Sequence, residues 1–229
     1  MINDTRHLTP APDRVILLTG FDPFGADTVN PSWLVAQALD GQRIAGHRVV
    51  AAQLSTVFGK SLRQLEALVA THRPALVVCL GQAGGRNALS LERVGINIDD
   101  ARIPDNAGKQ PIDAVVLEDG PPAYFSTLPI KAMAKAMIDA GIAASVSNTA
   151  GTFVCNHIFY AVMDRLAKGA AAPGARGGFI HIPPLPDQHG KRPDIAGIDL
   201  QTQIAGIRIA LEVAMTTTQD LRVTAGQIS

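Results

Sequence analysis

Two uninterrupted apolar runs place the strongest constraint on how this chain can fold. Residues 15–19 (VILLT) and residues 75–80 (ALVVCL) show no alternation with polar residues, and each run is followed by a glycine. Such runs are typical of strands that are buried on both faces of a parallel sheet. Because parallel strands are joined by helical crossovers, the two runs predict an α/β fold.

The remaining segments alternate between strand and helix patterns. Asn30 and Pro31 predict a helix start, as the N-cap and the first helical residue. Further strands are predicted near residues 47–54, 144–146 and 179–182, and further helices near residues 58–71, 129–140 and 199–215. This order predicts a single-domain three-layer α/β/α sandwich over residues 14–229, with a mostly parallel open sheet and helices on both faces. Residues 1–13 are predicted to form a loose N-terminal arm.

The composition argues against charged partners. Twenty basic and 20 acidic side chains cancel, so no field of one sign attracts nucleic acid or an anionic membrane surface. A neutral small ligand is the better expectation. The two cysteines cannot supply a disulfide framework, which is consistent with a reducing cytoplasm. Without a signal-peptide pattern or an apolar run of about 20 residues, a cytosolic protein is expected.

Open parallel sheets bind ligands at the carboxyl ends of their strands. Four loops are predicted to lie at that edge. They are GFDPFG and GQAGGR, which follow the two apolar runs, NTAGTFVC after residue 146, and IPPLPDQ after residue 181. Cys155 and His181 should therefore share one rim of the sheet.

Cys155 is predicted to lie in or near the first turn of a helix. There the free N–H groups and the helix dipole favour a thiolate over a thiol, and the same amides could bind an oxyanion. The alternative is a buried core cysteine, which is the usual environment of a free thiol. Cys79 lies in the middle of an apolar run and is predicted to be such a core residue.

A thiol nucleophile needs an imidazole as its base, and the chain has six histidines. His157 is only two residues from Cys155, so on a helix the two side chains would point to different faces. His181 and His189 remain as candidates. His181 is favoured because it ends a strand at the predicted rim, whereas His189 lies in a Gln-His-Gly loop. The other three lie in the arm, at a strand start and at a helix end: His7, His47 and His72.

Glu92 is the candidate carboxylate that would orient this imidazole. Residues 92–100 alternate, and Glu92 shares the parity of the apolar Val94, Ile96 and Ile98. On a buried face Glu92 would need a partner, and a pair with Arg93 or another arginine is equally compatible with the pattern. The nearby aspartates are predicted to be solvated turn residues: Asp99, Asp100 and Asp105.

The glycine-rich loop GQAGGR lacks the spacing of phosphate-binding and dinucleotide-binding loops. Its glycines would instead allow backbone to approach a small ligand, with the Gln82 amide as donor and acceptor. Phe21 and Phe24 in GFDPFG could wall an apolar pocket or pack in the core. No metal-binding motif is present, and we expect neither a metal nor a cofactor.

Four blocks together resemble the pyroglutamyl peptidase I family of cysteine peptidases. The blocks are GFDPFG, GQAGGR with ERVGINIDDARIPDNAG, SNTAGTFVCN and FIHIPPLP, and the resemblance covers most of residues 14–215. It implies an α/β/α sandwich with a catalytic triad and no cofactor, in a cytoplasmic enzyme that assembles as a homotetramer. Carried over by position, the triad residues are Cys155, His181 and Glu92.

The resemblance also implies a substrate, because this family removes the uncharged pyroglutamyl lactam from peptide N-termini. The Cys155 thiolate would attack the pyroglutamyl carbonyl, and His181 would protonate the leaving amine and activate water. Phe153 stands where many relatives have a tyrosine, so it keeps the ring but lacks the hydroxyl. Pro184 stands where an aromatic residue is common. Six residues become candidate substrate contacts by resemblance: Phe21, Phe24, Gln82, Phe153, Val154 and Arg102.

Two other functions are compatible with the sequence. A nucleoside phosphorylase or hydrolase on a similar scaffold would need cationic phosphate ligands, for which Arg86 and Arg102 are the candidates. A non-catalytic binding protein would keep the small-ligand pocket without turnover. Release of a fluorophore from a pyroglutamyl amide would favour the peptidase over both.

Overall fold

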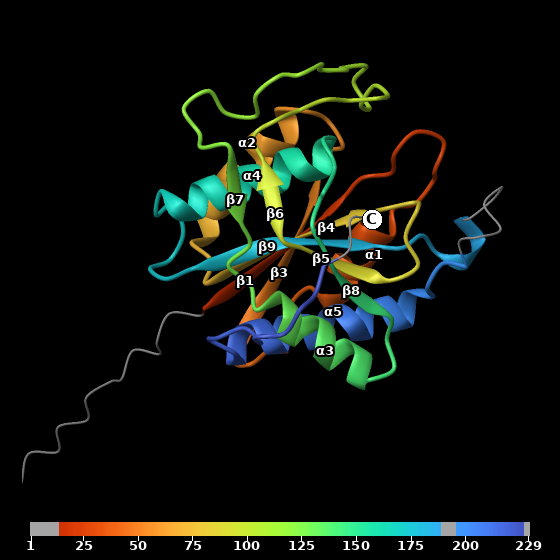
Figure 1. Ribbon diagram of the computed structural model, residues 1–229, viewed down its shortest axis with the longest axis vertical. Coiled ribbons are helices and arrows are strands. Elements are labelled where there is room, and N and C mark those ends of the chain that lie inside the picture. Colours follow the sequence, from red (N-terminus) through yellow and green to blue (C-terminus); the bar gives the residue numbers. More distant parts are fainter. Residues whose placement is uncertain (1–13, 189–195, 227–229) are drawn as a thin grey trace, which may run out of the picture.

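The structure is a computed structural model that describes residues 14–188 and 196–226. A seven-stranded sheet with the order β2-β3-β1-β4-β9-β5-β8 runs through the middle of the molecule (Figure 1). The two apolar runs of the sequence form the buried, adjacent strands β1 and β4, as predicted. The strands are Val15–Phe21 (β1), Arg43–Ile44 (β2), His47–Leu54 (β3), Leu76–Gln82 (β4), Leu89–Glu92 (β5), Ala144–Ser147 (β8) and Arg176–Ile182 (β9).

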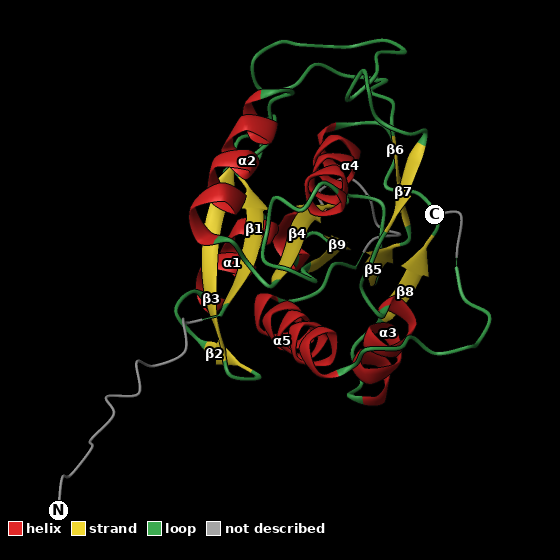
Figure 2. Cartoon of the chain, turned by 90° about the vertical axis from the view of Figure 1, so that its left-hand side faces the viewer, coloured by secondary structure: helices red, strands yellow, loops and turns green. Residues whose placement is uncertain are grey.

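Helices cover both faces of this sheet (Figure 2). α1, α3 and α5 pack on one face, where Val35, Met133 and Leu211 are buried. α2 and α4 pack on the other face, where Leu65 and Ile158 are buried. The predicted three-layer sandwich is therefore confirmed. The helices are Pro31–Leu39 (α1), Lys60–His72 (α2), Ile130–Asp139 (α3), Val154–Ala167 (α4) and Leu200–Thr216 (α5), with a short 3-10 helix at Pro186–Gln188.

Three strands of the sheet, β2, β5 and β8, run against the main direction, which the sequence did not predict. β1, β3, β4 and β9 are parallel to one another, whereas β5 is antiparallel to β9 and parallel to β8. β2 is also antiparallel to its neighbour β3. The sheet is thus mostly parallel but mixed. β8 runs opposite to β4 and β9, so the loop after β8 does not leave from the carboxyl edge as predicted, yet its residues 151–155 reach the same cavity as the loops after β1 and β4.

Residues 92–100 do not form one alternating strand, which corrects the interpretation of their pattern. β5 ends at Glu92, and Val94–Ile96 (β6) pairs with Ala123–Phe125 (β7) in a separate two-stranded sheet. Val94 and Ile96 are only partly buried, while every residue of β5 is buried. The burial of Glu92 therefore comes from the enclosure of β5 and not from an alternating face.

The helix starts show how the chain satisfies exposed backbone N–H groups. The predicted start of α1 is confirmed, because the Asn30 side chain accepts a hydrogen bond from the backbone N–H of Ser32 at 3.1 Å. α3 begins after Pro129, whose side chain makes no capping hydrogen bond. Asp220, in the segment that follows α5, accepts hydrogen bonds from the backbone N–H groups of Lys131 and Ala132 at 3.1 and 2.9 Å. The segment after α5 thus supplies the cap that α3 lacks.

Replacing this cap should destabilise the fold. Asp220→Ala should lower the free energy of unfolding by about 1 kcal/mol, because the first N–H groups of α3 lose their acceptor. Asp220→Asn retains an acceptor oxygen and should lower it less. Chemical denaturation followed by circular dichroism measures both variants. An equal loss in the two variants would contradict a capping role for the Asp220 side chain.

Candidate active site

Cys155 is the second residue of α4, so its predicted position at a helix start is confirmed. Phe153 is the N-cap, with an extended backbone (φ −100°, ψ −167°) and a side chain that makes no capping hydrogen bond. An apolar cap leaves the first backbone N–H groups of the helix without a side-chain acceptor. These N–H groups are available to a negatively charged oxygen beside the Cys155 sulfur.

The sulfur of Cys155 rests on the sheet at Gly81, near the end of β4. A Cβ at Gly81 would lie 2.8 Å from Cys155 Sγ and 2.7 Å from Cζ of Phe179, so only glycine allows this approach. Gly81 is paired in register with His181 on the neighbouring strand β9. The structure therefore brings Cys155 and His181 to the same end of β4 and β9, although the loop before Cys155 comes from the reversed strand β8.

His181 is held by Glu92 on β5. The ring Nδ1 lies 2.7 Å from Glu92 Oε1, and both side chains are buried. With an ionised carboxylate, Nδ1–H donates to Oε1, and Nε2 is left as the unprotonated nitrogen that can accept a proton. Glu92 is thus a carboxylate that fixes the tautomer of the ring, as the sequence hypothesis required.

Glu92 also pairs with an arginine, which is the contact expected under the alternative interpretation of this carboxylate. The arginine is Arg86 from the loop before β5, and its Nη1 lies 2.6 Å from Glu92 Oε1. Arg86 Nη2 donates to the backbone carbonyl of Thr149 at 3.0 Å. Arg93, the neighbour in sequence, instead donates from Nε to Asn148 Oδ1 at 2.7 Å.

The protonation state of Cys155 differs from the expectation based on its helix position. Burial raises the pKa of the thiol to about 12; the Glu92 carboxylate raises it further, while the Arg86 guanidinium opposes both. The sulfur therefore keeps its proton at neutral pH and needs a base to become a nucleophile. Burial likewise raises the pKa of Cys79 to about 12, and Cys79 is fully buried in the core as predicted.

A cavity of about 650 Å³ opens above Cys155. It is lined by Cys155 and by all six residues that were expected to contact a substrate: Phe21, Phe24, Gln82, Phe153, Val154 and Arg102. Sequence reasoning missed the other lining residues, which carry mostly small or polar side chains: Asp27, Asn30, Thr56, Gly84, Asp100, Ile103, Gly151 and Thr152. Loops far apart in sequence thus converge on the thiol.

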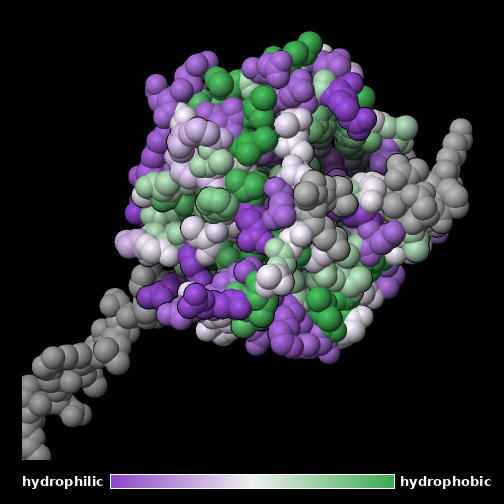
Figure 3. Space-filling model, in the orientation of Figure 1, coloured by the Kyte–Doolittle hydropathy of each residue, from purple (hydrophilic) through white to green (hydrophobic). Residues whose placement is uncertain are grey.

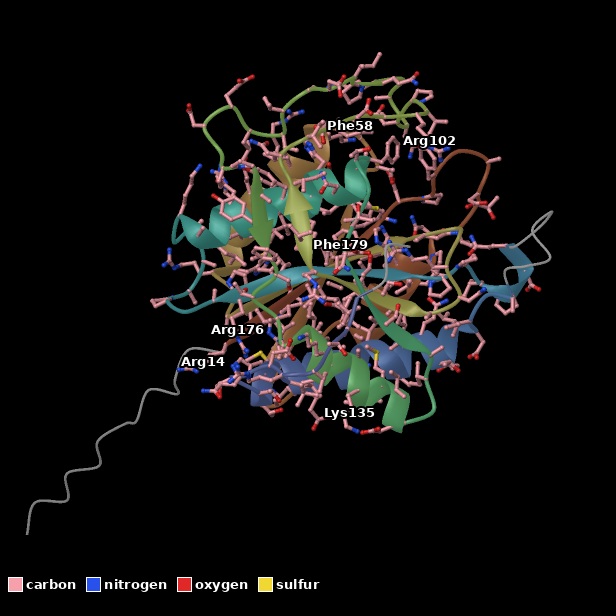
Figure 4. All side chains as sticks on the ribbon, in the orientation of Figure 1. Arg14, Phe58, Arg102, Lys135, Arg176 and Phe179 are labelled. Carbon is pink, nitrogen blue, oxygen red and sulfur yellow. The ribbon has the colours of Figure 1, made fainter. Side chains whose placement is uncertain are left out.

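Aromatic rings form one wall of this site. The Phe153 ring makes edge contacts with Phe24 and Phe58 at centroid distances of 5.4 and 5.3 Å. Figure 4 shows Phe58 and Arg102 on the α2 and α4 side of the sheet, above Phe179. Phe58 was not singled out in the sequence, where it falls at the start of a predicted helix; in the structure it lies in the loop between β3 and α2. Phe21 lines the cavity and is only 3% exposed, so it both walls the pocket and packs in the core, the two roles expected for it.

His157 is engaged in a separate buried pair. Its Nδ1 lies 2.8 Å from Asp99 Oδ2, and its Nε2 accepts a hydrogen bond from the backbone N–H of Gly59 at 3.2 Å. Its exclusion as the base for Cys155 is consistent with these contacts. Asp99 and Asp105 are 5% exposed, so the prediction of solvated turn residues is wrong for both. They are buried because each accepts hydrogen bonds that hold loops together, as Asp105 does from the N–H of Phe58 at 2.8 Å.

His189, the alternative base, lies outside the described residues. Within the described ranges, no group of three or more histidine, cysteine, aspartate or glutamate side chains is arranged to hold a metal ion.

Comparisons with known proteins point to one family. A sequence model described as Pyroglutamyl peptidase matches residues 14–217. A pyrrolidone-carboxylate peptidase of Cupriavidus taiwanensis is 54% identical over 213 residues, which cover 93% of this chain and 98% of that protein. A protein of the same name from Bacillus cytotoxicus is 52% identical over 208 residues, covering 91% of this chain and 96% of that one.

Solved structures agree with the sequence comparison. The crystal structure of pyroglutamyl peptidase I from Bacillus amyloliquefaciens is similar with a TM-score of 0.88 at 43% identity, and the match covers 93% of this chain and all of that chain. The pyrrolidone carboxyl peptidase of Thermococcus litoralis is similar with a TM-score of 0.87 at 32% identity, covering 92% and 99% of the two chains.

The contact between Cys155 and Gly81 can be tested by adding a methyl group. Gly81→Ala should lower the free energy of unfolding by roughly 1–3 kcal/mol, since the new Cβ overlaps Cys155 Sγ and the Phe179 ring. Thermal unfolding measures the change. Gly84→Ala is the matched control, because a Cβ there meets nothing within 4 Å. If both variants unfolded at the wild-type temperature, the sulfur would not be seated on the strand as described.

Proposed function

Since this chain belongs to the pyroglutamyl peptidase family, we propose that Cys155, His181 and Glu92 form its catalytic triad. The protein is a cysteine peptidase of the pyroglutamyl peptidase I type, and it hydrolyses the amide bond that follows an N-terminal pyroglutamyl residue. The observation that carries the assignment of the triad is the seating of Cys155 on Gly81, beside a histidine bound to a buried glutamate.

The reaction starts from a protonated thiol. His181 Nε2 takes the proton of Cys155 as the sulfur attacks the pyroglutamyl carbonyl, and Glu92 stabilises the imidazolium that forms. The backbone N–H groups at the start of α4 bind the developing oxyanion. His181 then gives the proton to the leaving amine, and it activates a water molecule that hydrolyses the acyl-enzyme.

The cavity suits a small uncharged ring. We assign the lactam to the space beside Phe24 and Phe153, whose faces and edges can pack against its two sides. The Gln82 amide can pair with the lactam N–H or C=O, since it both donates and accepts. Phe21 and Val154 complete the apolar lining, and we assign the exposed Arg102, which also lines the cavity, to the oxyanion side of the site.

Neither alternative function finds support in the comparisons. A nucleoside phosphorylase or hydrolase would need Arg86 as a phosphate ligand, but both of its terminal nitrogens are engaged by Glu92 and Thr149. A binding protein without turnover would not require a base held ready by a buried carboxylate. The arrangement around His181 therefore favours catalysis over binding alone.

Substitutions in the triad should separate the three roles. Cys155→Ala should lower kcat/KM on a fluorogenic pyroglutamyl amide by roughly 10³-fold or more, because no nucleophile remains. His181→Ala should lower it nearly as much, since the pKa of the thiol is raised and attack needs a base. Glu92→Gln should retain more activity than either, because an amide can still orient the ring.

These assays need a check that the variants fold, which circular dichroism supplies. Wild-type rates in Cys155→Ala or Cys155→Ser would overturn the mechanism. If His181→Ala cleaved the substrate as fast as Glu92→Gln, His181 would not be the base.

We also infer that the peptidase is a cytoplasmic homotetramer. The support is the family resemblance, the two unpaired cysteines and the apolar residues left on the surface, of which Ile112 is 74% and Phe125 is 68% exposed. Figure 3 shows a band of apolar residues, coloured green, down the upper middle of one face. In the described part of the chain, no helix has the length and apolarity to cross a membrane.

Sedimentation velocity tests the assembly. A tetramer should sediment with a mass about four times the 24.0 kDa of one chain. Exchange of the exposed apolar side chains Ile112 and Phe125 for serine should shift the population toward smaller species if they lie in an interface. A single species with the mass of one chain at all concentrations would contradict the proposal.

A further inference from the structure

Arg86 contacts the proposed triad but has no role in the proposed proton transfer. Arg86 lies in the GQAGGR loop between β4 and β5, and its side chain is only 17% exposed. Its Nη1 lies 2.6 Å from Glu92 Oε1, and its Nη2 donates to the Thr149 carbonyl at 3.0 Å. A mostly buried cation that contacts the orienting carboxylate will influence whatever that carboxylate does.

Arg86 and His181 share a single oxygen atom of Glu92. Oε1 lies 2.6 Å from Arg86 Nη1 and 2.7 Å from His181 Nδ1, whereas Oε2 is buried and makes no hydrogen bond with the described residues. The guanidinium thus offsets the negative charge at the very atom that faces the imidazole. It therefore weakens the attraction of that carboxylate for an imidazolium.

The second contact of Arg86 reaches the segment before the nucleophile. Thr149 lies in the loop that joins β8 to α4, six residues before Cys155. Arg86 therefore links the orienting carboxylate to the loop that delivers the sulfur. A single guanidinium can make both bonds because its donors form a rigid planar fork.

We propose that Arg86 is a positioning residue that offsets the charge of Glu92 beside the His181 ring, and that ties the loop before Cys155 to Glu92. This inference rests on the proposed function, because it assigns Arg86 a part in the same proton transfer. Arg86 acts through Glu92 and Thr149 and does not itself touch the reacting atoms.

The other titratable groups around His181 come from the elements packed against β9. β4 contributes Cys79, whose thiol is neutral at ordinary pH; β5 contributes Glu92; and α4 contributes Cys155. His157 of α4 is engaged by Asp99. Arg86 is the cation of this group, so its removal should alter the charge balance at His181 most directly.

Removal of the guanidinium should shift the pH dependence of the reaction in one direction. Without it, nothing offsets the negative charge of Glu92, which then attracts the imidazolium form of His181 more strongly. The neutral base then becomes available only at higher pH. In Arg86→Met the acid limb of the kcat/KM profile should move upward by about one pH unit or more. Arg86→Lys retains the charge and should keep the limb near its wild-type position, with a lower kcat because one ammonium cannot hold both partners.

A direct titration makes the test independent of turnover. The ring protons of His181 can be followed by NMR in Cys155→Ala protein, with and without Arg86→Met, and assigned through His181→Gln. A higher titration midpoint without Arg86 is the expected result. If wild-type protein failed to cleave pyroglutamyl amides, the proposed function would fail, yet this titration would still report whether Arg86 sets the charge state of His181.

Arg93→Met is the matched control. Arg93 also contacts the loop before Cys155, through Asn148, but it does not touch Glu92 in the described contacts. The Arg93→Met substitution should therefore leave the acid limb of the kcat/KM profile at its wild-type position. Two results would overturn the proposal. One is a folded Arg86→Met protein whose acid limb and His181 titration midpoint are both unchanged; the other is an acid limb that moves as far in Arg86→Lys as in Arg86→Met. If Arg86→Met did not fold, Arg86→Gln would be measured in its place.

Discussion

The contact between the first turn of α4 and Gly81 is the constraint on which the site depends. α4 is buried over most of its length, with Val154, Ile158 and Val162 fully enclosed. A helix packed in this way cannot slide to accommodate a larger residue beneath it. The position of the Cys155 sulfur is therefore set by core packing, which holds a reacting atom more accurately than a free loop would.

The antiparallel pairing of β5 with β9 explains how the Glu92 side chain reaches His181. Ser90 lies opposite His181 in the antiparallel pair, and Glu92 is two residues further along the same strand. Such diagonal neighbours are within reach of long side chains. Arg86 lies just before the strand and returns to the same carboxylate. A parallel β5 would have separated the residues before the strand from those after it.

Local patterns were enough to predict most of the fold and part of the site. The apolar runs identified β1 and β4, capping identified α1, and elimination led to His181. Glu92 was chosen for an incorrect reason, because its burial comes from the enclosed strand β5 and not from alternation beyond it.

What the sequence could not provide depends on contacts between distant segments. Phe58 stands beside Phe153 only after folding, and Asp220 caps a helix about 90 residues away in sequence. The charge state of Cys155 was also misjudged, since an argument from the helix end alone omits burial and the nearby Glu92. Electrostatic effects of this kind become visible only when the neighbours are known.

The buried charges of the site balance before the reaction begins. Glu92 and Arg86 carry opposite charges and contact each other, so with a neutral imidazole, as the proposed mechanism requires, the enclosed group has no net charge. In that mechanism, proton transfer from sulfur to ring creates an ion pair inside this group, where the carboxylate already faces the ring. The negative charge passes to the substrate oxygen beside the N–H groups of α4. A neutral lactam can enter such a site without changing its net charge. A free, positively charged N-terminus would instead have to be desolvated beside an apolar wall, which is unfavourable.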